Sequence, residues 1–508
     1  MRAALEAASS YGQRRLSLDE LMAQRIRKVE LFREAGVDPY PTRARRTHTA
    51  AAATTLVESL PPDTGETAVG AISVAGRVVA RREMGKATFI DLQDGTGRIQ
   101  TLLRQNQLAE GQYELLRLVD LGDFISVDGE PMRTRTGQPT VGATSWTMLT
   151  KALHAPPEKY HGLADMELRQ RRRYLDLMAN EATRRTFTAR SKVVAAIRRF
   201  LDDRGFLEVE TPILQESAGG AAARPFTTHY NTLEEDRFLR ISLELHLKRL
   251  VVGGFDRVYE IGRNFRNEGM SMKHNPEFTM LEVYEAYSDY IGVAAMAEEM
   301  VATVAEEALG SMRFEFRGNE IDLTPPWHRL TLHDALRDYG DLDIDEYSTA
   351  ETLRPELERR GLTLPSVAGW GKLVDEAMSH YVEPKLIQPT FLLDYPVELS
   401  PLAKRKPDNP RLVERFEVFI GGFEAGNAYT ELNDPVDQRL RFEEQLLLKA
   451  AGDDEVELVD EDFLFALEHG MPPTGGFGMG IDRLVMILTG QPSIRDVILF
   501  PQHKTVKD

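Results

Sequence analysis

The stretch from Arg257 to Tyr287 most constrains how this chain of 508 residues folds. Two runs within it, Val258 to Ile261 and Phe278 to Val283, show the alternation that is typical of strands. A polar loop that contains Gly269 and Pro276 separates the two runs, and these residue types are typical of turns. The stretch therefore predicts a long antiparallel hairpin.

Charged and aromatic side chains gather around that loop. The guanidinium of Arg266 offers forked donors that suit a phosphate or a carboxylate, and Phe278 offers a flat apolar face to a base. Lys273 and His274 add positive charge, and Glu268 adds an acceptor. A single charged turn is usually only a solvated surface feature. The full combination favours a binding site.

The run Phe265-Arg266-Asn267-Glu268 resembles the second signature motif of class II aminoacyl-tRNA synthetases. The resemblance implies that Arg266 holds the α-phosphate of ATP and the carboxylate of the amino acid, which makes it a catalytic residue. It also implies that Phe278 stacks on adenine. ATP contacts are expected as well from Glu268, Lys273 and His274.

Composition excludes several other classes of protein. The chain has no cysteine, so disulfides, thiolate zinc sites and cysteine nucleophiles are excluded, and a reducing cytoplasm fits. No apolar run approaches the roughly 18 residues of a membrane span, and the N-terminus has no hydrophobic segment behind basic residues. The length and the 42% of hydrophobic residues predict a globular cytoplasmic protein of two or three domains.

The net charge of −18 argues by itself against a nucleic-acid partner. The charge is unevenly distributed, however: residues 1–200 hold 31 Lys and Arg against 23 Asp and Glu, whereas residues 201–508 hold 31 against 57. A basic front half suits a polyanion, and an acidic back half suits metal ions and ammonium groups. Most of these charges also keep the surface solvated.

Residues 1–66 are expected to form an amphipathic helix and a connector. The helix is predicted over Ser17 to Ala35, and the segment from Pro41 to Thr67 has no clear period. The expected apolar face consists of Leu18, Leu21, Met22, Ile26, Val29 and Phe32. The basic residues Arg25, Arg27, Lys28 and Arg33 form either a solvated face or an RNA-backbone contact.

Residues 67–152 are expected to form a five-stranded OB barrel, the fold that binds oligonucleotides on its sheet face. The predicted strands are Ala71 to Ala80, Ala87 to Leu92, Arg98 to Leu103, Asp123 to Asp128 and Val141 to Met148. Phe89 and Gln100, with Arg77 nearby, resemble the anticodon-binding residues of the aspartyl, asparaginyl and lysyl branch of the family. The resemblance implies that they read the anticodon.

A hinge over residues 153–180 leads to a catalytic domain over 181–508, which gives a multi-domain α+β protein with an antiparallel sheet flanked by helices. A helix from about Glu181 to Arg204 runs into the extended segment Gly205 to Pro212, which resembles the first class II motif and implies a homodimer. Gly220 leaves room for a ligand's α-amino end, although a flexible loop fits equally well. The region 313–379 is interpreted as a helical insertion without chemistry, and Leu399 to Arg411 as a polar surface loop.

Glu417 and Glu424 flank the turn pair Gly421-Gly422, so their carboxylates can converge across a tight bend. Hard oxygen ligands suit Mg²⁺, which neutralises a triphosphate. The resemblance implies that these two glutamates hold magnesium on ATP.

The run Asn427 to Pro435 resembles lysyl-tRNA synthetases, most of which carry phenylalanine at the position of Tyr429. A buried ammonium needs paired carboxylates and a further acceptor, which the resemblance finds in Glu282, Tyr284 and Glu431. The remaining implied lysine contacts are Gly220, Glu244, Arg266, Asn427 and Tyr429.

The run from Pro472 to Arg483 resembles the third class II motif, in which Arg483 covers adenine, reaches the γ-phosphate and acts as a second catalytic residue. Neither a dinucleotide fingerprint nor a Walker A sequence is present. The resemblance implies lysine activation by Mg-ATP and transfer of lysine to tRNA-Lys. The alternatives are an aspartyl or asparaginyl enzyme, a tRNA-independent lysine ligase and a non-catalytic RNA-binding regulator.

Overall fold

The computed structural model describes residues 18–60, 70–157, 165–217, 219–221, 223–366, 368–450 and 459–505, and for 448–450 it describes the backbone only. The chain divides into two compact units, Met1–Gly162 and Leu163–Asp508. The parts of the sequence predictions that fall on residues 1–17, 61–69 and 158–164 and on Ala222 lie outside the described residues.

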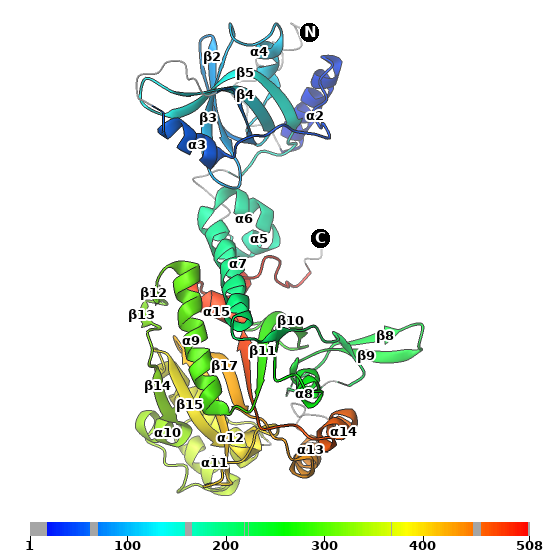
Figure 1. Ribbon diagram of the computed structural model, residues 1–508, viewed down its shortest axis with the longest axis vertical. Coiled ribbons are helices and arrows are strands. Elements are labelled where there is room, and N and C mark those ends of the chain that lie inside the picture. The colour runs from blue at the N-terminus through cyan, green and yellow to red at the C-terminus, as the bar shows by residue number, and fades with distance from the viewer. Residues whose placement is uncertain are drawn as a thin grey trace. The chain divides into compact units, whose positions relative to one another are not determined.

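The first unit is built on a closed five-stranded barrel with the strand order β1-β2-β3-β5-β4 (Figure 1). Its strands are β1 (Ile72–Met84), β2 (Ala87–Gln93), β3 (Arg98–Arg104), β4 (Phe124–Arg133) and β5 (Pro139–Thr150), and the short helix α4 (Gln112–Leu115) lies between β3 and β4. Strand interiors alternate between buried apolar residues and more exposed ones, as along Ile90, Asp91 and Leu92 of β2. The predicted OB barrel is confirmed.

Two helices precede the barrel. The predicted connector contains the helix α3 (Ala50–Glu58), which Thr49 caps by accepting a hydrogen bond from the backbone N–H of Ala52. Ala50 and Ala53 of this helix are buried in the barrel core. The prediction of a connector missed this helix, because small alanines pack closely on the strands without giving the apolar period of a longer helix.

The helix α2 (Leu18–Glu34) docks through only the C-terminal part of the predicted apolar face, Val29 and Phe32, together with Leu31. These three residues are buried, whereas Leu21 and Ile26 remain about two-fifths exposed. Arg25 donates to the carbonyl oxygen of Ala152 (2.8 Å), and Lys28 forms an ion pair with Asp120 (2.6 Å). These two cations therefore hold the helix on the barrel.

The second unit contains an eight-stranded sheet with the order β14-β15-β16-β17-β18-β11-β10-β6. Its strands are β6 (Leu207–Glu208), β10 (Arg257–Phe265), β11 (Glu277–Ala286), β14 (His328–Thr331), β15 (Thr390–Pro396), β16 (Leu412–Ile420), β17 (Phe423–Thr430) and β18 (Thr474–Gly480). The predicted hairpin is confirmed as the antiparallel pair β10 and β11, with Glu260 opposite Glu282. The extended segment after Gly205 is shorter than expected, since β6 has only two residues.

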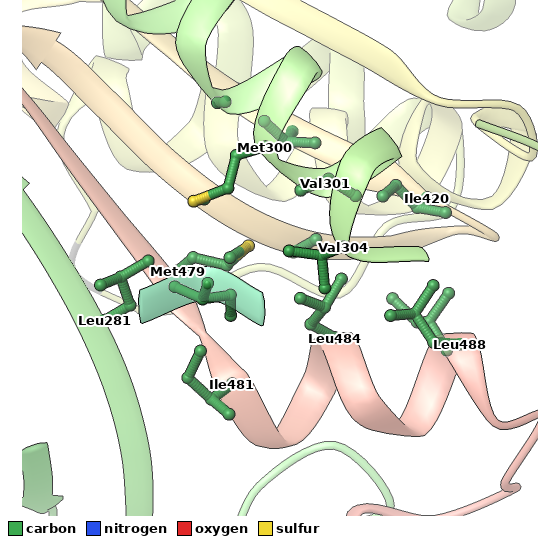
Figure 2. Packing of buried hydrophobic residues seen from close by; sticks show 14 of the residues in the cluster. Leu281, Met300, Val301, Val304, Ile420, Met479, Ile481, Leu484 and Leu488 are labelled. Atoms are coloured by element: carbon green, nitrogen blue, oxygen red, sulfur yellow. The ribbon is translucent and has the colours of Figure 1, made fainter. Parts of the chain in front are cut away.

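Three helices cover one face of this sheet: α7 (Glu181–Asp202), α9 (Tyr290–Leu309) and α15 (Ile481–Leu488). In Figure 2, Met300 and Val304 of α9 point toward Met479 of β18 and Leu484 of α15. Successive strand residues alternate between this core and the opposite face. The residues of these strands that face away from the three helices include Glu282 and Tyr284 of β11, Asn427 and Tyr429 of β17, and Gly476 and Gly478 of β18.

The region 313–379 begins with strands rather than helices. A hairpin of β12 (Arg313–Phe316) and β13 (Asn319–Asp322) precedes β14, and only then follow α10 (Leu332–Gly340), α11 (Ala350–Arg359) and α12 (Trp370–Tyr381). The prediction of a purely helical insertion was wrong because these four-residue strands are too short and too charged to show a clear alternation.

The other elements of the second unit surround the sheet. They are α5 (Met166–Arg171), α6 (Arg173–Ala179), α8 (Glu244–Val252), α13 (Pro435–Ala450), α14 (Glu461–Glu468) and a small sheet of β7 (Leu214–Gln215), β8 (Thr227–Tyr230) and β9 (Glu235–Leu239). Among the described helices, none is long and apolar enough to cross a membrane.

A buried ion pair joins α7 to the strand and helix that carry Phe278 and Arg483. Arg190 of α7 lies 2.5 Å from the Asp482 carboxylate and donates to the hydroxyl of Thr279 (3.1 Å). Asp482 also accepts the backbone N–H of Thr279 at 2.7 Å. This network fixes β11 and α15 relative to each other.

Arg190→Leu should destabilise the protein by about 3–5 kcal/mol, because it leaves the Asp482 carboxylate buried without its cation. Urea denaturation measures this loss. Arg185→Leu on the same helix is the matched control, since its ion pair with Glu181 is exposed, and its effect should stay within about 0.5 kcal/mol. Equal free energies of unfolding for the two variants would contradict a stabilising role of the Arg190–Asp482 ion pair.

Candidate active site

A cavity of about 600 Å³ opens on the uncovered side of strands β11, β17 and β18 in the second unit. Every predicted ATP and lysine ligand lines it: Gly220, Glu244, Arg266, Glu268, Lys273, His274, Phe278, Glu282, Tyr284, Asn427, Tyr429, Glu431 and Arg483. Glu424 of the predicted metal pair also lines the cavity, whereas Glu417 does not.

One end of the cavity is rich in buried carboxylates. Glu282 accepts hydrogen bonds from the hydroxyl of Ser242 (3.0 Å), the backbone N–H of Leu243 (3.2 Å) and the phenol of Tyr284 (3.0 Å). Burial raises the pKa of Glu282 to about 7, and the nearby Glu244 carboxylate acts in the same direction. The Glu282 carboxylate therefore readily binds a proton or a cation.

Glu244 and Glu431 share a buried lysine at this end. Lys248, one helical turn after Glu244, donates to that glutamate at 2.5 Å and forms an ion pair with Glu431. Tyr429 donates its phenol proton to the other oxygen of Glu244 at 2.7 Å. In the sequence, Glu244 and Lys248 look like an ordinary solvated i,i+4 ion pair on a helix. The sequence alone therefore does not indicate that Lys248 is buried beside the site.

Two glycines of β18 form the floor between these groups. Gly476 lies opposite both Tyr284 and Tyr429, and a Cβ there would collide with the carboxylate of Glu431. Gly478 is the next residue on the same face, and its Cβ would lie 2.8 Å from Met280. The absence of a side chain at Gly476 therefore makes room for the carboxylate end of the cavity.

The other end of the cavity holds the arginines and the aromatic ring. The guanidinium of Arg266 lies 5.2 Å from the ring centre of Phe278, within the range of a cation–π contact. Arg483 donates to the carboxylate of Glu424 (2.8 Å) and to its carbonyl oxygen (2.9 Å). Burial lowers the pKa of His274, and the cations Arg483 and Lys273 lower it further, so the imidazole is neutral.

Glu417 lies on β16 beside this end, and its carboxylate is already engaged by protein groups. Arg415 donates to it at 2.7 Å and Tyr395 at 2.9 Å. Burial raises the pKa of Glu417 to about 7; Arg415 opposes this effect and Glu424 adds to it. The Glu424 carboxylate thus lies close enough to disturb the ionisation of Glu417 across the hairpin of β16 and β17.

Two regions that the sequence analysis left without chemistry also line the cavity. Gly369, Trp370, Lys372 and Asp375 at the start of α12 belong to the region 313–379, and Glu398 to Leu402 belong to the expected surface loop. Leu402 is buried. Both interpretations were wrong because these segments show no known motif, and tertiary folding alone brings them to the cavity.

The comparisons with known proteins identify the family. Residues 165–504 match the model of class II tRNA synthetases (D, K and N), and residues 72–149 match an OB-fold nucleic acid binding domain. The lysine–tRNA ligase of Dehalococcoides mccartyi is 53% identical over 96% of this chain and 98% of its own length. Those of Moorella thermoacetica and Roseiflexus castenholzii are 52% and 51% identical, over 95% and 96% of this chain and 97% and 99% of their own.

The chain belongs to the lysine–tRNA ligases of the class II tRNA synthetase family. It is therefore an ATP-dependent enzyme with a tRNA-binding OB-fold domain. The fold expected from the sequence and the family resemblance are both confirmed.

In this ligase, strand register places the three predicted anticodon-binding residues on one face of the barrel. Gln100 pairs with Asp91, two residues along β2 from Phe89, and Arg77 pairs with Gln93 on the same face of β2. The guanidinium of Arg77 lies 4.3 Å from the ring centre of Phe124 and donates to the carbonyl oxygen of Gly122 (3.0 Å). Gln100 accepts a hydrogen bond from Thr140 (3.0 Å).

The raised pKa of Glu282 predicts pH-dependent lysine affinity of the ligase. Below pH 7 this carboxyl holds a proton, which an incoming ammonium must displace, so the dissociation constant for lysine should rise about tenfold from pH 8 to pH 6. Titration calorimetry at several pH values measures it. Glu282→Gln should bind lysine more weakly but without this dependence. A wild-type affinity that is constant from pH 6 to pH 8 would refute the assignment.

Proposed function

We propose that this chain activates L-lysine with ATP to lysyl-adenylate, releases pyrophosphate, and transfers lysine to the 3′-terminal adenosine of tRNA-Lys. The observation that carries the proposal is the set of three buried carboxylates, Glu244, Glu282 and Glu431, at one end of a cavity whose other end holds Arg266 and Arg483. Acidic groups suit the ammonium groups of lysine, and the arginines suit its carboxylate and the phosphates of ATP.

The proposed lysine contacts follow from this polarity. Glu431, Glu282 and Tyr284 receive the ε-ammonium, while Glu244, Asn427 and the space beside Gly220 receive the α-amino end. Gly220 has φ of +83°, and a Cβ there would lie 3.3 Å from the Cβ of Glu244. A side chain at this position would therefore narrow the cavity. Tyr429 packs along the chain of the substrate.

The proposed chemistry needs no protein nucleophile. An oxygen of the lysine carboxylate attacks the α-phosphorus of ATP, the bond to the β-phosphate oxygen breaks, and pyrophosphate leaves. Arg266 and Arg483 hold the reacting groups and stabilise their negative charge, and Phe278 stacks on adenine. Glu268, Lys273 and His274 contact ATP from the loop. A ribose hydroxyl of the tRNA then attacks the lysyl carbonyl, and AMP leaves.

The carboxylate pair at the nucleotide end fits Mg²⁺. Glu417 and Glu424 supply hard oxygen atoms, and Glu424 raises the cost of ionising Glu417, which a divalent cation would relieve. We assign these residues as the ligands of Mg²⁺ on ATP. When bound, the ion neutralises triphosphate charge and favours departure of pyrophosphate.

The proposal also covers the quaternary state and the compartment. Strand β6 lies at the edge of the main sheet, and Leu207, Ile213 and Leu214 near it are each about half exposed. Apolar side chains on a sheet edge favour an interface. We therefore infer a homodimer that covers this edge, and we place the enzyme in the cytoplasm with the translation machinery.

Amino-acid-dependent exchange of pyrophosphate into ATP, run across all twenty amino acids, tests this function. Lysine should support exchange at least about a hundredfold better than aspartate or asparagine. The buried carboxylates repel an acidic side chain, and a neutral side chain leaves their charges unpaired. Subsequent charging of tRNA-Lys separates the enzyme from a tRNA-independent lysine ligase. No exchange with any amino acid would indicate a non-catalytic RNA-binding protein instead.

If the barrel contacts only the anticodon, a change in the barrel should affect tRNA charging and leave adenylate formation intact. Phe89→Ala should weaken tRNA charging by about 1–3 kcal/mol through lost base stacking, while lysine-dependent exchange stays unchanged. Steady-state charging at varied tRNA concentration measures this effect. Leu121→Ala, an exposed apolar residue of the same unit, is the control and should charge normally. Loss of lysine-dependent exchange in Phe89→Ala would contradict the assignment of anticodon binding to the barrel and of adenylate formation to the second unit.

A further inference from the structure

Lys248 is a buried cation beside the acidic end of the cavity, and none of the substrate contacts proposed above uses it. Its side chain is fully buried between Glu244 and Glu431, and it does not itself line the cavity. Its ammonium also lies 5.5 Å from the ring centre of Tyr429 and 5.8 Å from that of Phe463. Packing and pairing thus hold it in one place.

The charges at the acidic end of the cavity can be counted from its titratable groups. Three carboxylates converge there, from Glu244 of α8, Glu282 of β11 and Glu431 after β17, and the remaining titratable groups are the phenols of Tyr284 and Tyr429. Among the described residues, Lys248 is the fully buried cation that pairs with these carboxylates, whereas Arg266, whose charge also acts on Glu282, belongs to the arginine end of the cavity. Three negative charges and one positive charge leave two negative charges unbalanced.

Free L-lysine carries two ammonium groups, one at the α-carbon and one at the end of its side chain. Because desolvated charges must be paired, a site with two unbalanced carboxylates fits a ligand with two ammonium groups. Without Lys248 the site would hold three unbalanced carboxylates, and one of them would bind a proton instead.

We propose that Lys248 is a positioning residue for substrate recognition, which favours the charged form of Glu431 and fixes Glu431 and Glu244 so that the site accepts an amino acid with two ammonium groups. This proposal rests on the proposed function. Burial raises the pKa of Glu431, and the Lys248 ammonium is the strongest effect in the opposite direction. Burial lowers the pKa of Lys248 itself, but the two glutamates outweigh it, so the residue stays charged.

Lys248→Met tests the proposal, because it keeps the length and removes the charge. At pH 8 Lys248→Met should release up to about one proton more than the wild type on binding lysine, since Glu431 must lose its proton to the solvent before it pairs with the incoming ammonium. Titration calorimetry of the full chain in two buffers with different ionisation enthalpies counts these protons. The dissociation constant for lysine should rise at least about tenfold at pH 8 and about tenfold more at pH 7.

Two further variants separate positioning from a merely structural role. Lys248→Arg retains the charge and should keep the proton count of the wild type. Lys248→Met combined with Glu244→Gln removes one charge of each sign, so its proton count should return toward the wild-type value; this variant also serves if Lys248→Met does not fold. The dissociation constant for ATP should stay unchanged in all three.

Unchanged lysine affinity and proton count in Lys248→Met would overturn the proposal, and so would equal losses of lysine and ATP affinity. Failure of the wild type to bind lysine at all would instead overturn the proposed function.

Discussion

The alternation of side chains along β11 and β18, and along β17 from Gly426 onward, is the constraint on which the rest of the catalytic unit depends. Leu281, Ala428 and Phe477 point into the apolar core under α9 and α15, so their neighbours necessarily point to the other side. A shift of one residue in register would bury the carboxylates in the core and expose the apolar residues. The core therefore positions the substrate site, and the Arg190–Asp482 pair holds its nucleotide edge.

Polarity then divides the cavity into two ends. Carboxylates gather where the strands carry Glu282 and Glu431, and arginines gather where the hairpin loop and α15 carry Arg266 and Arg483. In the proposed function, lysine spans these ends with its side-chain ammonium toward the carboxylates and its own carboxylate toward the arginines. Positioning of this kind supplies the main catalytic effect in a reaction without a protein nucleophile.

Much of the fold could be predicted from the sequence, because the barrel strands, the hairpin and the helices α7 and α9 have clear periods and turn residues. The predicted ligands of ATP and lysine could also be placed, since they lie within recognisable motifs. Lys248 could not be predicted, because only tertiary folding brings Glu431 to it and turns an ordinary helical pair into a buried bridge. The contribution of Trp370 and Asp375 likewise depends on the docking of α12.

Lysine selectivity by paired buried charges is the central claim, and the dissociation constants of Glu431→Gln for lysine and for ATP test it most directly. The variant keeps the size of the side chain and an acceptor but removes one charge, so lysine affinity should fall by about 2–5 kcal/mol. ATP affinity should change little, since its proposed contacts lie at the other end of the cavity. Unchanged lysine affinity in this variant would contradict the account.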